Sequence, residues 1–356
     1  MGSMSKVLVA MSGGVDSSVA AALLKEQGHH VCGVTMKLLD KKPQDPPQDG
    51  PRSCCGYDAA RDAKLVADEI GIPHHVVNAT DVFRETVIAD FVDEYKNGRT
   101  PNPCVRCNRF VKFDYLMKKA DELGCEFLAT GHYAVREGNR LYKGADAKKD
   151  QAYFLYVIYG AEIRRILFPL GKMTKDEIRR IAAGLHLITA QKPESQDICF
   201  AEGGNYAAAL GPGNSGKEGP IVDISGHVIG KHCGIHCYTV GQRKGLGALG
   251  KKMFVKEIRT ADNAIVVGSE DDLSARTIEV TNVILATDYG LNPSLECDVQ
   301  VRYRSKPVKG KIVQRGPTDF AVSLSEPVRA IAPGQSAVFY EGDMVIGGGI
   351  IKNAAP

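Results

Sequence analysis

Lys6-Val-Leu-Val-Ala-Met-Ser-Gly-Gly-Val-Asp-Ser-Ser18 is an apolar run that leads into a glycine pair, an acid and two hydroxyls. An Ala- and Leu-rich segment, Val19–Leu24, comes directly after it. This order predicts a buried strand, a tight turn and the start of a helix. Glycines allow the backbone to come close to an anion, and the N–H groups at a helix start point toward it. An ordinary helix cap is the alternative interpretation, because Ser and Asp are good caps. Seven consecutive residues of suitable type favour the phosphate-binding turn.

The turn differs from the common nucleotide-binding loop, G-x-x-x-x-G-K-[ST], in which a lysine reaches the terminal phosphates. No lysine is present here, and Asp16 stands where a carboxylate can hold Mg²⁺ beside phosphates. Ser-Gly-Gly-Val-Asp-Ser resembles the PP-loop of the ATP pyrophosphatases. That resemblance implies cleavage of ATP between its α and β phosphates and use of the AMP to activate a carbonyl oxygen.

The composition is typical of a soluble protein with more than one domain. The 356 residues exceed what one hydrophobic core usually holds, and 44% are hydrophobic and 24% charged. A net charge of +3 is only weak evidence for a polyanionic partner. No apolar run reaches the roughly 18 residues that span a bilayer, and no signal peptide is visible. We therefore expect a cytoplasmic protein without a membrane partner, whose ten cysteines stay mostly reduced.

The first half of the chain alternates between strand and helix patterns. Strands are predicted at Lys6–Met11, Val31–Lys37, His74–Val77 and Phe127–Thr130, and helices at Ser17–Gln27, Asp58–Ile70, Val82–Lys96 and Phe113–Leu123. Such alternation predicts a parallel sheet with ligands outside the carboxyl ends of its strands. A capping box, Thr174-Lys-Asp-Glu177, predicts a further helix that ends at about Leu185.

From Pro220 onward, short β-like runs are separated by Gly, Asp and Asn, which predicts an all-β C-terminal half. The predicted fold is therefore an α/β N-terminal domain with a parallel, Rossmann-like sheet and a PP-loop, followed by a small central domain and a C-terminal β-barrel. We interpret residues 1–5 as a tag and the natural start, 6–198 as the ATP-binding catalytic domain with a helical extension, 199–272 as the central domain and 273–356 as the barrel.

Three cysteines stand out. Thr100-Pro-Asn-Pro-Cys104-Val-Arg-Cys107-Asn108 contains two of them, and its prolines predict an extended loop between helices. Cys199 lies in Ser195-Gln-Asp-Ile-Cys-Phe200. Buried structural thiols are one interpretation, and half of a zinc site is another, since C-x-x-C is a common ligand spacing. Sulfur or redox chemistry is the third, because the nearby Arg106 and Arg109 favour thiolate.

Six motifs in the same order as in a known family decide between these interpretations. They are SGGVDSS and the stretches Arg99–Asn108, Ala129–Tyr133, Lys149–Gln151, Ser195–Phe200 and Tyr238–Gly247. Together they resemble the tRNA-specific 2-thiouridylases over most of the chain. The resemblance implies that ATP adenylates the C2 oxygen of the wobble uridine, that sulfur replaces this oxygen and that AMP departs. It implies tRNA as substrate, ATP and Mg²⁺ as cofactors, and a sulfur donor: a sulfur-carrier protein, a cysteine desulfurase or free sulfide.

The same resemblance implies roles for individual residues. Cys199 matches the cysteine that carries a persulfide, and Cys107 matches the partner that releases or transfers its sulfur. The implied ATP-binding positions are Ala10, Met11, Ser12, Gly13, Gly14, Val15, Asp16, Ser17, Met36 and Gly131. The positions implied to approach the target base are Asn102, Pro103 and Cys104. Those implied to contact tRNA elsewhere are Lys149, Asp150, Gln151, Arg302 and Tyr303.

Cys104 departs from the family pattern, since many members have Asp there. With Cys107 and Cys199 it resembles a subgroup suspected of holding an iron–sulfur cluster. Three thiolates leave one iron of a [4Fe–4S] cluster open for exogenous sulfide. The competing route needs only a persulfide on Cys199 and the Cys107 thiol, with Cys104 as a spectator. Both routes stay open here, and Cys104→Ala separates them.

Two further features carry weaker predictions. A basic stripe near the C-terminal strands includes Arg302 and Arg304, which strand alternation places on one face with Tyr303 on the other. Such a stripe suits a tRNA backbone. Cys233 and Cys237, with their histidine neighbours, suggest zinc, but strand alternation favours simple packing.

Two other functions remain as alternatives: an amide-forming ligase with a PP-loop, and a non-catalytic RNA-binding protein with a structural metal. The ligase does not need the paired cysteines, and the RNA-binding protein does not need SGGVDSS. tRNA-dependent exchange between ATP and pyrophosphate discriminates all three functions.

Overall fold

The computed structural model describes residues 4–39, 57–160, 162–194, 198–200, 216–247, 252–286, 289 and 294–356. It divides the chain into two compact units. The first contains Met1–Val87, Cys104–Gly204 and Asp343–Val345, and the second contains Ile88–Pro103, Asn205–Gly342 and Ile346–Pro356. In the part of the chain that is described, no helix has the length and apolar character needed to cross a membrane.

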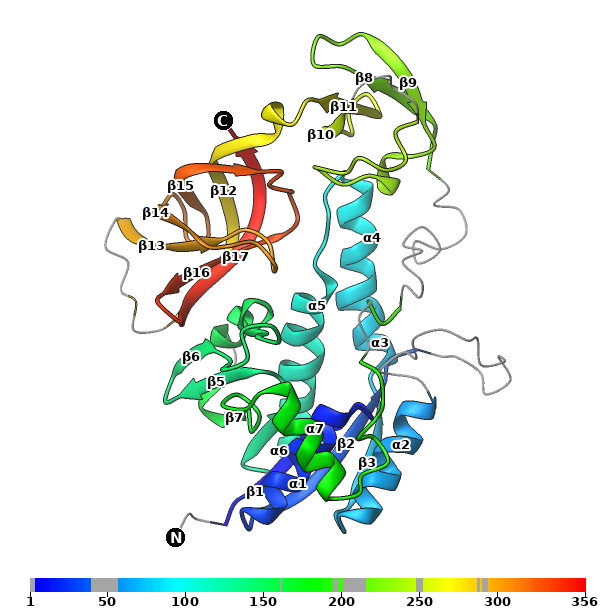
Figure 1. The fold of residues 1–356 in the computed structure, drawn as a ribbon, viewed down its shortest axis with the longest axis vertical. Helices are drawn as coiled ribbons and strands as arrows, with labels where there is room; N and C mark the ends of the chain where they lie inside the picture. Colours follow the sequence, from blue (N-terminus) through cyan, green and yellow to red (C-terminus); the bar gives the residue numbers. More distant parts are fainter. Residues whose placement is uncertain are drawn as a thin grey trace. The chain divides into compact units, whose positions relative to one another are not determined.

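A five-stranded parallel sheet forms the centre of the first unit (Figure 1). Its members are β1 (Lys6–Ala10), β2 (His30–Lys37), β3 (His74–Asn78), β4 (Phe127–Thr130) and β7 (Ile166–Leu167), in the order β3-β2-β1-β4-β7. All four neighbouring pairs are parallel, which confirms the predicted sheet. Because β1 is central, its residues Val7, Leu8 and Val9 are completely buried.

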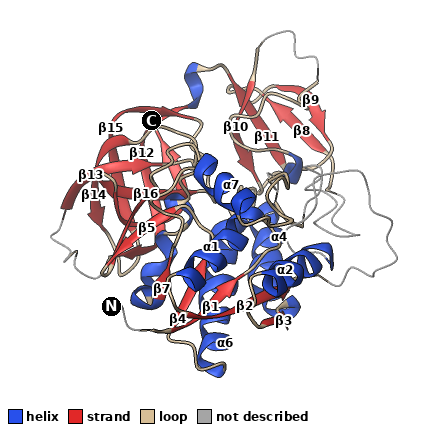
Figure 2. Ribbon diagram, turned by 60° about the horizontal axis from the view of Figure 1, so that its bottom comes forward, coloured by secondary structure: helices blue, strands red, loops and turns tan. Residues whose placement is uncertain are grey.

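Helices cover both faces of this sheet (Figure 2). On one face lie α1 (Val15–Glu26), α2 (Tyr57–Glu69) and α7 (Lys175–Gly184), and on the other lies α6 (Leu116–Glu122). The hydrophobic core joins Val19 of α1 to Val66 of α2 and Ile178 of α7. The turn after β1 is therefore fixed between a buried strand and a helix packed on two others.

The stretch that carries the paired cysteines is helical, and the predicted extended loop is wrong from Pro103 onward. Helix α5 (Pro103–Arg106) runs into η2 (Cys107–Tyr115), a stretch of wide π-type turns, and then into α6. Proline is well suited to the first position of a helix, where no N–H is needed. Cys104 and Cys107 are therefore three residues apart on one helical surface.

The remaining helices and strands of the first unit differ in part from the prediction. Helices α3 (Thr80–Phe83), η1 (Arg84–Ile88) and α4 (Ala89–Lys96), the last in the second unit, replace the single helix predicted at Val82–Lys96. A hairpin of β5 (Ala134–Glu137) and β6 (Arg140–Lys143) was not predicted, and β6 pairs with Met344 and Val345. Three short 3-10 helices follow: η3 (Ala152–Phe154), η4 (Tyr156–Gly160) and η5 (Ile163–Arg165).

The second unit is mainly β, as predicted. A four-stranded sheet contains β8 (Gly219–Val222), β9 (Val228–His232), β10 (Phe254–Arg259) and β11 (Ala264–Gly268), in the order β10-β11-β8-β9. The six strands of the barrel are β12 (Ser274–Leu285), β13 (Ser294–Gln300), β14 (Val308–Gln314), β15 (Phe320–Arg329), β16 (Ser336–Glu341) and β17 (Met344–Ala355). Pairing of β12 with both β15 and β17 closes the barrel.

Two predicted strand segments are instead turns. Strand β13 ends at Gln300, whose side-chain Nε2 donates to the carbonyl oxygens of Tyr303 at 2.7 Å and Ser305 at 3.0 Å. The prediction that alternation sorts Arg302 from Tyr303 onto opposite strand faces is therefore wrong. Strand β9 likewise ends at His232, and the 3-10 turn η7 (Ile235–Cys237) follows it, so alternation does not apply there either.

The capping box predicted at the start of α7 is confirmed, and it provides a test of local stability. Thr174 Oγ1 accepts from the Glu177 N–H at 3.4 Å, and Glu177 Oε2 accepts from the Thr174 N–H at 2.7 Å. We expect Thr174→Ala to lower the opening free energy of α7 by about 1 kcal/mol, measured by native-state hydrogen exchange. Thr174→Ser keeps the oxygen and is the control. If the amides of α7 were protected equally in Thr174→Ala and in the wild type, the stabilising role of the cap would be contradicted.

Candidate active site

The turn after β1 is shaped by its own hydroxyl groups. Helix α1 begins at Val15 with Gly14 as the residue before it. Ser17 Oγ accepts from the Ser12 N–H at 3.1 Å and donates to the Gly14 carbonyl at 3.2 Å, and Ser18 Oγ donates to the same carbonyl at 2.9 Å. The serines thus bind the loop to the first turn of the helix. The start of α1 combines this fixed backbone with the positive end of a helix, which suits an anion.

Two glycines allow the backbone segments around this turn to approach closely. Gly13 has a φ of +65°, and a Cβ there would lie 2.3 Å from the carbonyl oxygen of Ala59. A Cβ on Gly131 would lie 2.8 Å from the backbone nitrogen of Ser17. Real Cβ atoms do not approach other atoms so closely, so any side chain at either position forces the backbone to move.

The residues predicted to bind ATP gather at one edge of the sheet. Ala10 ends β1, Met36 lies near the end of β2, and Gly131 directly follows β4. These three strands are adjacent and parallel, so their carboxyl ends meet where the turn lies. This edge is where doubly wound sheets bind ligands.

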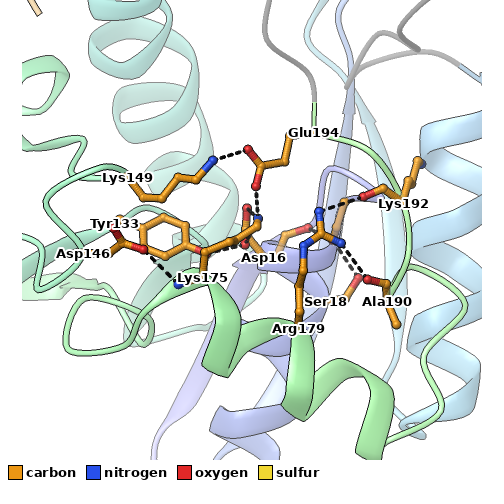
Figure 3. A network of polar contacts seen from close by, with 12 residues as sticks. Asp16, Ser18, Tyr133, Asp146, Lys149, Lys175, Arg179, Ala190, Lys192 and Glu194 are labelled. Atoms are coloured by element: carbon orange, nitrogen blue, oxygen red, sulfur yellow. Dashed lines mark hydrogen bonds and ion pairs between the residues drawn. The ribbon is translucent and has the colours of Figure 1, made fainter. Parts of the chain in front are cut away.

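Asp16 is the centre of a polar network at this edge (Figure 3). Its carboxylate accepts from Lys175 Nζ at 2.7 and 2.9 Å and from the Tyr133 hydroxyl at 2.7 Å. Lys175 is only 7% exposed, although it carries a charge. Burial, together with the Asp16 carboxylate, raises the pKa of Tyr133 well above its usual value, so the phenol stays protonated.

Glu194 extends the network toward the segment that contains Cys199. Its two oxygens accept from Lys175 at 2.8 Å and from Lys149 at 2.5 Å. Burial by itself raises the pKa of Glu194, but the hydrogen bonds from the two lysines outweigh it and hold the pKa below its usual range. A third lysine, Lys192, donates at 2.7 Å to both the Gly13 carbonyl and Asp62.

Sequence reasoning missed these contacts to the turn. It noted that the motif lacks a lysine, and the fold supplies Lys175 from a helix that begins 159 residues after Asp16. The capping box indicated that Lys175 opens a helix, but no local signal indicated what it faces. Tyr133 and Lys192 both stood in or beside quoted motifs without an assigned role.

His132 lies beneath the site as a neutral imidazole. It is 8% exposed, with Nδ1 2.8 Å from Thr130 Oγ1 and Nε2 3.2 Å from Lys112 Nζ. Burial and then the positive charge of Lys112 hold its pKa well below the usual value. Because an ammonium only donates, Nε2 accepts from Lys112 and the ring proton is on Nδ1.

The three cysteines of interest all belong to the first unit. Cys104 is exposed, Cys107 is buried at the start of η2, and Cys199 is half-buried. The ring of Phe200 packs edge-to-face on Phe83 with centroids 5.7 Å apart, and α3, which ends at Phe83, packs against η2. Phe200, the residue after Cys199, therefore packs on α3. Helix α3 in turn packs on η2, the helical stretch that begins at Cys107.

A cluster held by Cys104, Cys107 and Cys199 would need the three thiols to converge. Among the described residues, which include Cys104, Cys107 and Cys199, no three Cys, His, Asp or Glu side chains are gathered so that they can hold a metal ion. Cys32, Cys125 and Cys297 are buried, which is typical of thiols that pack in a core.

The positions implied to contact tRNA fall into two groups. Lys149, Asp150 and Gln151 belong to the first unit. The side-chain Oε1 of Gln151 accepts from the Tyr133 N–H at 3.0 Å, and the backbone N–H of Gln151 donates to the Tyr133 carbonyl at 2.9 Å. Asp150 accepts from the Gly144 and Ala152 N–H groups. These two residues therefore hold the loop that presents Tyr133 to Asp16.

The second group lies in the second unit and includes Asn102, Pro103, Arg302 and Tyr303. The residues before Asn102 are fastened by two contacts from the barrel: the Thr100 N–H donates to the Pro333 carbonyl at 2.8 Å, and Gln335 donates to the Thr100 and Pro101 carbonyls. Arg302 donates to the Ala330 carbonyl at 2.6 Å, so its guanidinium is held against the barrel.

A parallel sheet with a glycine-rich, lysine-free turn after its central strand defines a PP-loop nucleotide-binding domain. Comparison with known families agrees with this class. A model described as a tRNA methyl transferase HUP domain matches residues 5–203. A tRNA methyl transferase PRC-barrel domain matches 213–269, and an aminomethyltransferase beta-barrel domain matches 276–351.

Curated relatives match the chain over almost its whole length. The tRNA-specific 2-thiouridylase of Carboxydothermus hydrogenoformans is 45% identical over 98% of this chain and 97% of its own length. Those of Halothermothrix orenii and Clostridium acetobutylicum are 44% and 46% identical, each over 98% of this chain and 99% of their own. The chain belongs to the tRNA-specific 2-thiouridylase family and is an enzyme.

The buried His132 generates a prediction about pH. Its folded pKa lies below the unfolded value of about 6.5, so the unfolded chain alone takes up this proton as the pH falls. The stability that neutral His132 contributes is complete above pH 6.5 and is lost as the pH falls toward the folded pKa. We expect the melting temperature of the wild type to fall more between pH 7 and pH 5 than that of His132→Gln, measured by calorimetry. His30→Gln, at an exposed position, is the control and keeps the wild-type slope.

Proposed function

We propose that this enzyme uses ATP to convert the C2 oxygen of the wobble uridine of tRNA into a thiocarbonyl. The observation that carries the proposal is the presence, in one compact unit, of a PP-loop edge and of cysteines from two distant stretches, Cys107 and Cys199. The relatives' names support the same reaction. The family models carry methyl transferase descriptions, but the thiols and the PP-loop favour sulfur transfer after adenylation.

In the first step, the backbone of residues 10–17 and Gly131 bind ATP at the carboxyl edge of the sheet. The uridine C2 oxygen attacks the α-phosphorus, and pyrophosphate leaves. The Asp16 carboxylate suits Mg²⁺, a hard cation that takes oxygen ligands, and the ion would supply charge neutralisation for the pyrophosphate. Met36 completes the ATP-binding set that we propose.

Lys175 supplies the positive charge that the motif itself lacks. Its ammonium is buried between Asp16 and Glu194 and is held on the ATP side of the sheet. A fixed cation at this point favours the charge that develops on the leaving pyrophosphate, and it needs little rearrangement to do so. Glu194 and Tyr133 act as positioning residues, because they touch Lys175 and Asp16.

In the second step, sulfur arrives from Cys199. We propose that Cys199 carries the persulfide and that Cys107 attacks its Sγ, so that a Cys107–Cys199 disulfide forms while the terminal sulfur bonds to C2 and AMP leaves. An external thiol then reduces the disulfide. We propose this persulfide route in place of the iron–sulfur cluster route, and Cys104 is proposed to lie beside the base.

The tRNA is proposed to meet both groups of positions described above. Lys149, Arg302 and Tyr303 supply contacts that are independent of sequence, and Asn102 and Pro103 approach the base. We propose the division of the chain expected from the sequence: the ATP-binding catalytic domain in residues 6–198, the central domain in 199–272 and tRNA binding by the barrel. Cys199, at the boundary between the first two, adds its thiol to the catalytic domain. The sulfur donor is proposed to be a carrier protein, a cysteine desulfurase or sulfide.

The role of Lys175 is tested by Lys175→Met. We expect tRNA-dependent exchange of pyrophosphate into ATP to fall by about 100-fold, the usual cost of losing a charge-stabilising group. Lys175→Arg keeps the charge and is expected to retain part of the activity. Lys172→Met, at an exposed position three residues before Lys175, is the control. Folding is checked by the melting temperature of each variant, and unchanged exchange in a folded Lys175→Met would contradict the role.

The sulfur step is tested with three cysteine variants under anaerobic conditions. Purified enzyme, ATP, substrate tRNA and a persulfide donor are combined, and 2-thiouridine is measured by mass spectrometry of digested tRNA. We expect Cys199→Ser and Cys107→Ser to abolish the product but to retain tRNA-dependent pyrophosphate exchange. Cys104→Ala is expected to stay active.

The outcomes separate the alternatives. Loss of activity in Cys104→Ala together with bound iron and sulfide in the wild type would favour the cluster route. Absence of tRNA-dependent exchange in every variant, including the wild type, would favour the amide-forming ligase or a non-catalytic RNA-binding protein.

A further inference from the structure

A second pair of cysteines lies in the second unit, outside the ATP site. Cys233 directly follows strand β9, and Cys237 is the last residue of the 3-10 turn η7. Their Sγ atoms are 3.7 Å apart, and both residues are exposed. Sulfur atoms four residues apart meet here because Gly234, with a φ of +144°, turns the backbone between them.

The surrounding histidines do not complete a zinc site. His232 uses both of its ring nitrogens: Nε2 lies 2.9 Å from the Asn263 carbonyl, and Nδ1 accepts from the Gly234 N–H at 3.0 Å. Only His236 is close to a thiol, with Nε2 3.3 Å from Cys237 Sγ. A tetrahedral site needs four donors, and within the described ranges no group of three candidate ligands is gathered for a metal. The two thiols therefore face chiefly each other.

We propose that Cys233 and Cys237 are a reversible dithiol–disulfide pair that small-molecule disulfides oxidise. The Cys233 thiolate attacks one sulfur of the oxidant and releases the first small thiol, which leaves a mixed disulfide. Cys237 then gives up its proton and attacks Cys233 Sγ, which releases the second small thiol. The protein loses two electrons and two protons, and the oxidant gains both. This inference is independent of the proposed tRNA chemistry.

Geometry and accessibility support this exchange. The Sγ atoms must move from 3.7 Å to about 2.05 Å, a change within the reach of side-chain rotation. The disulfide closes only a short loop, so it gains little chain entropy and stays easily reduced. Partial desolvation of its thiol, together with the neighbouring Cys233, raises the pKa of Cys237 to about 11, so Cys237 is poorly suited to make the first attack.

The pair is connected to the basic loop Gln242–Gly247. Gln242 Nε2 donates to the Cys237 carbonyl at 3.1 Å and to the Lys244 carbonyl at 2.9 Å. The Tyr238 hydroxyl donates to the Gly245 carbonyl at 2.9 Å, and its ring belongs to the core of the small β-sheet. Oxidation therefore restrains the turn η7. Through the hydrogen bonds of Gln242 and Tyr238, it also restrains the loop that contains Arg243 and Lys244.

The test is a titration of the full-length protein with mixtures of reduced and oxidised glutathione. After alkylation and trypsin digestion, the peptide His232–Arg243 contains both cysteines and no others. We expect the form that carries two alkyl groups to be replaced, as the oxidised fraction rises, by a form two hydrogen atoms lighter than the unmodified dithiol peptide. The alkylated form should return when reduced glutathione is added before alkylation. In Cys233→Ser and Cys237→Ser, the remaining thiol is expected to carry glutathione instead. A Cys107→Ser/Cys199→Ser double variant is expected to behave as the wild type.

A second readout follows the loop itself. Brief proteolysis of the native protein by trypsin after Arg243 and Lys244 is expected to slow several-fold on oxidation in the wild type but not in Cys233→Ser. A His232–Arg243 peptide that stays reduced, or ends only as glutathione adducts, would overturn the proposal. So would stoichiometric zinc that is released from the untreated protein by a chelator and whose removal is needed before oxidation.

Discussion

The ion pair between Asp16 and Lys175 is the contact on which the catalytic edge depends. It joins the turn after β1 to the first residue of α7, and the Tyr133 hydroxyl and Glu194 bind to it from two further loops. A buried ammonium needs such partners, because an unpaired charge in this position is very costly. Nucleotide binding, the position of Glu194 and the packing of α7 are therefore coupled through one side chain.

Much of the fold could be predicted from sequence, because the signals were local. The alternation of strands and helices gave the parallel sheet, and the Thr174 capping box gave the start of α7. The errors arose where one local rule competed with another. Pro103 was interpreted as breaking a helix, but it begins one, since the first position of a helix needs no N–H. Arg302 and Tyr303 lie beyond β13 because the Gln300 side chain binds their turn, a tertiary contact without a local signal.

The residues of the candidate site also fall into two classes: those that a contiguous motif identifies and those that only tertiary packing brings to the site. The backbone of the turn after β1 belongs to one contiguous sequence motif, so its residues could be named directly. Lys175 and Glu194 reach it from elsewhere in the chain, and their contacts follow only from how α7 packs on α1. The cysteines were identifiable as a set, but their arrangement was not, because a helix presents Cys104 and Cys107 differently from a loop.

The close approach of Gly131 to the backbone of Ser17 also limits how this protein can evolve. Any larger residue there would press on the first turn of α1 itself. We therefore expect it to lower both the stability of the fold and the affinity of this turn for an anion. A compensating mutation would have to displace a helix that is packed on two others, and single substitutions rarely do this. Strong epistasis is therefore expected at this position: tolerance to replacement should be lowest here and should not recover in stabilised backgrounds.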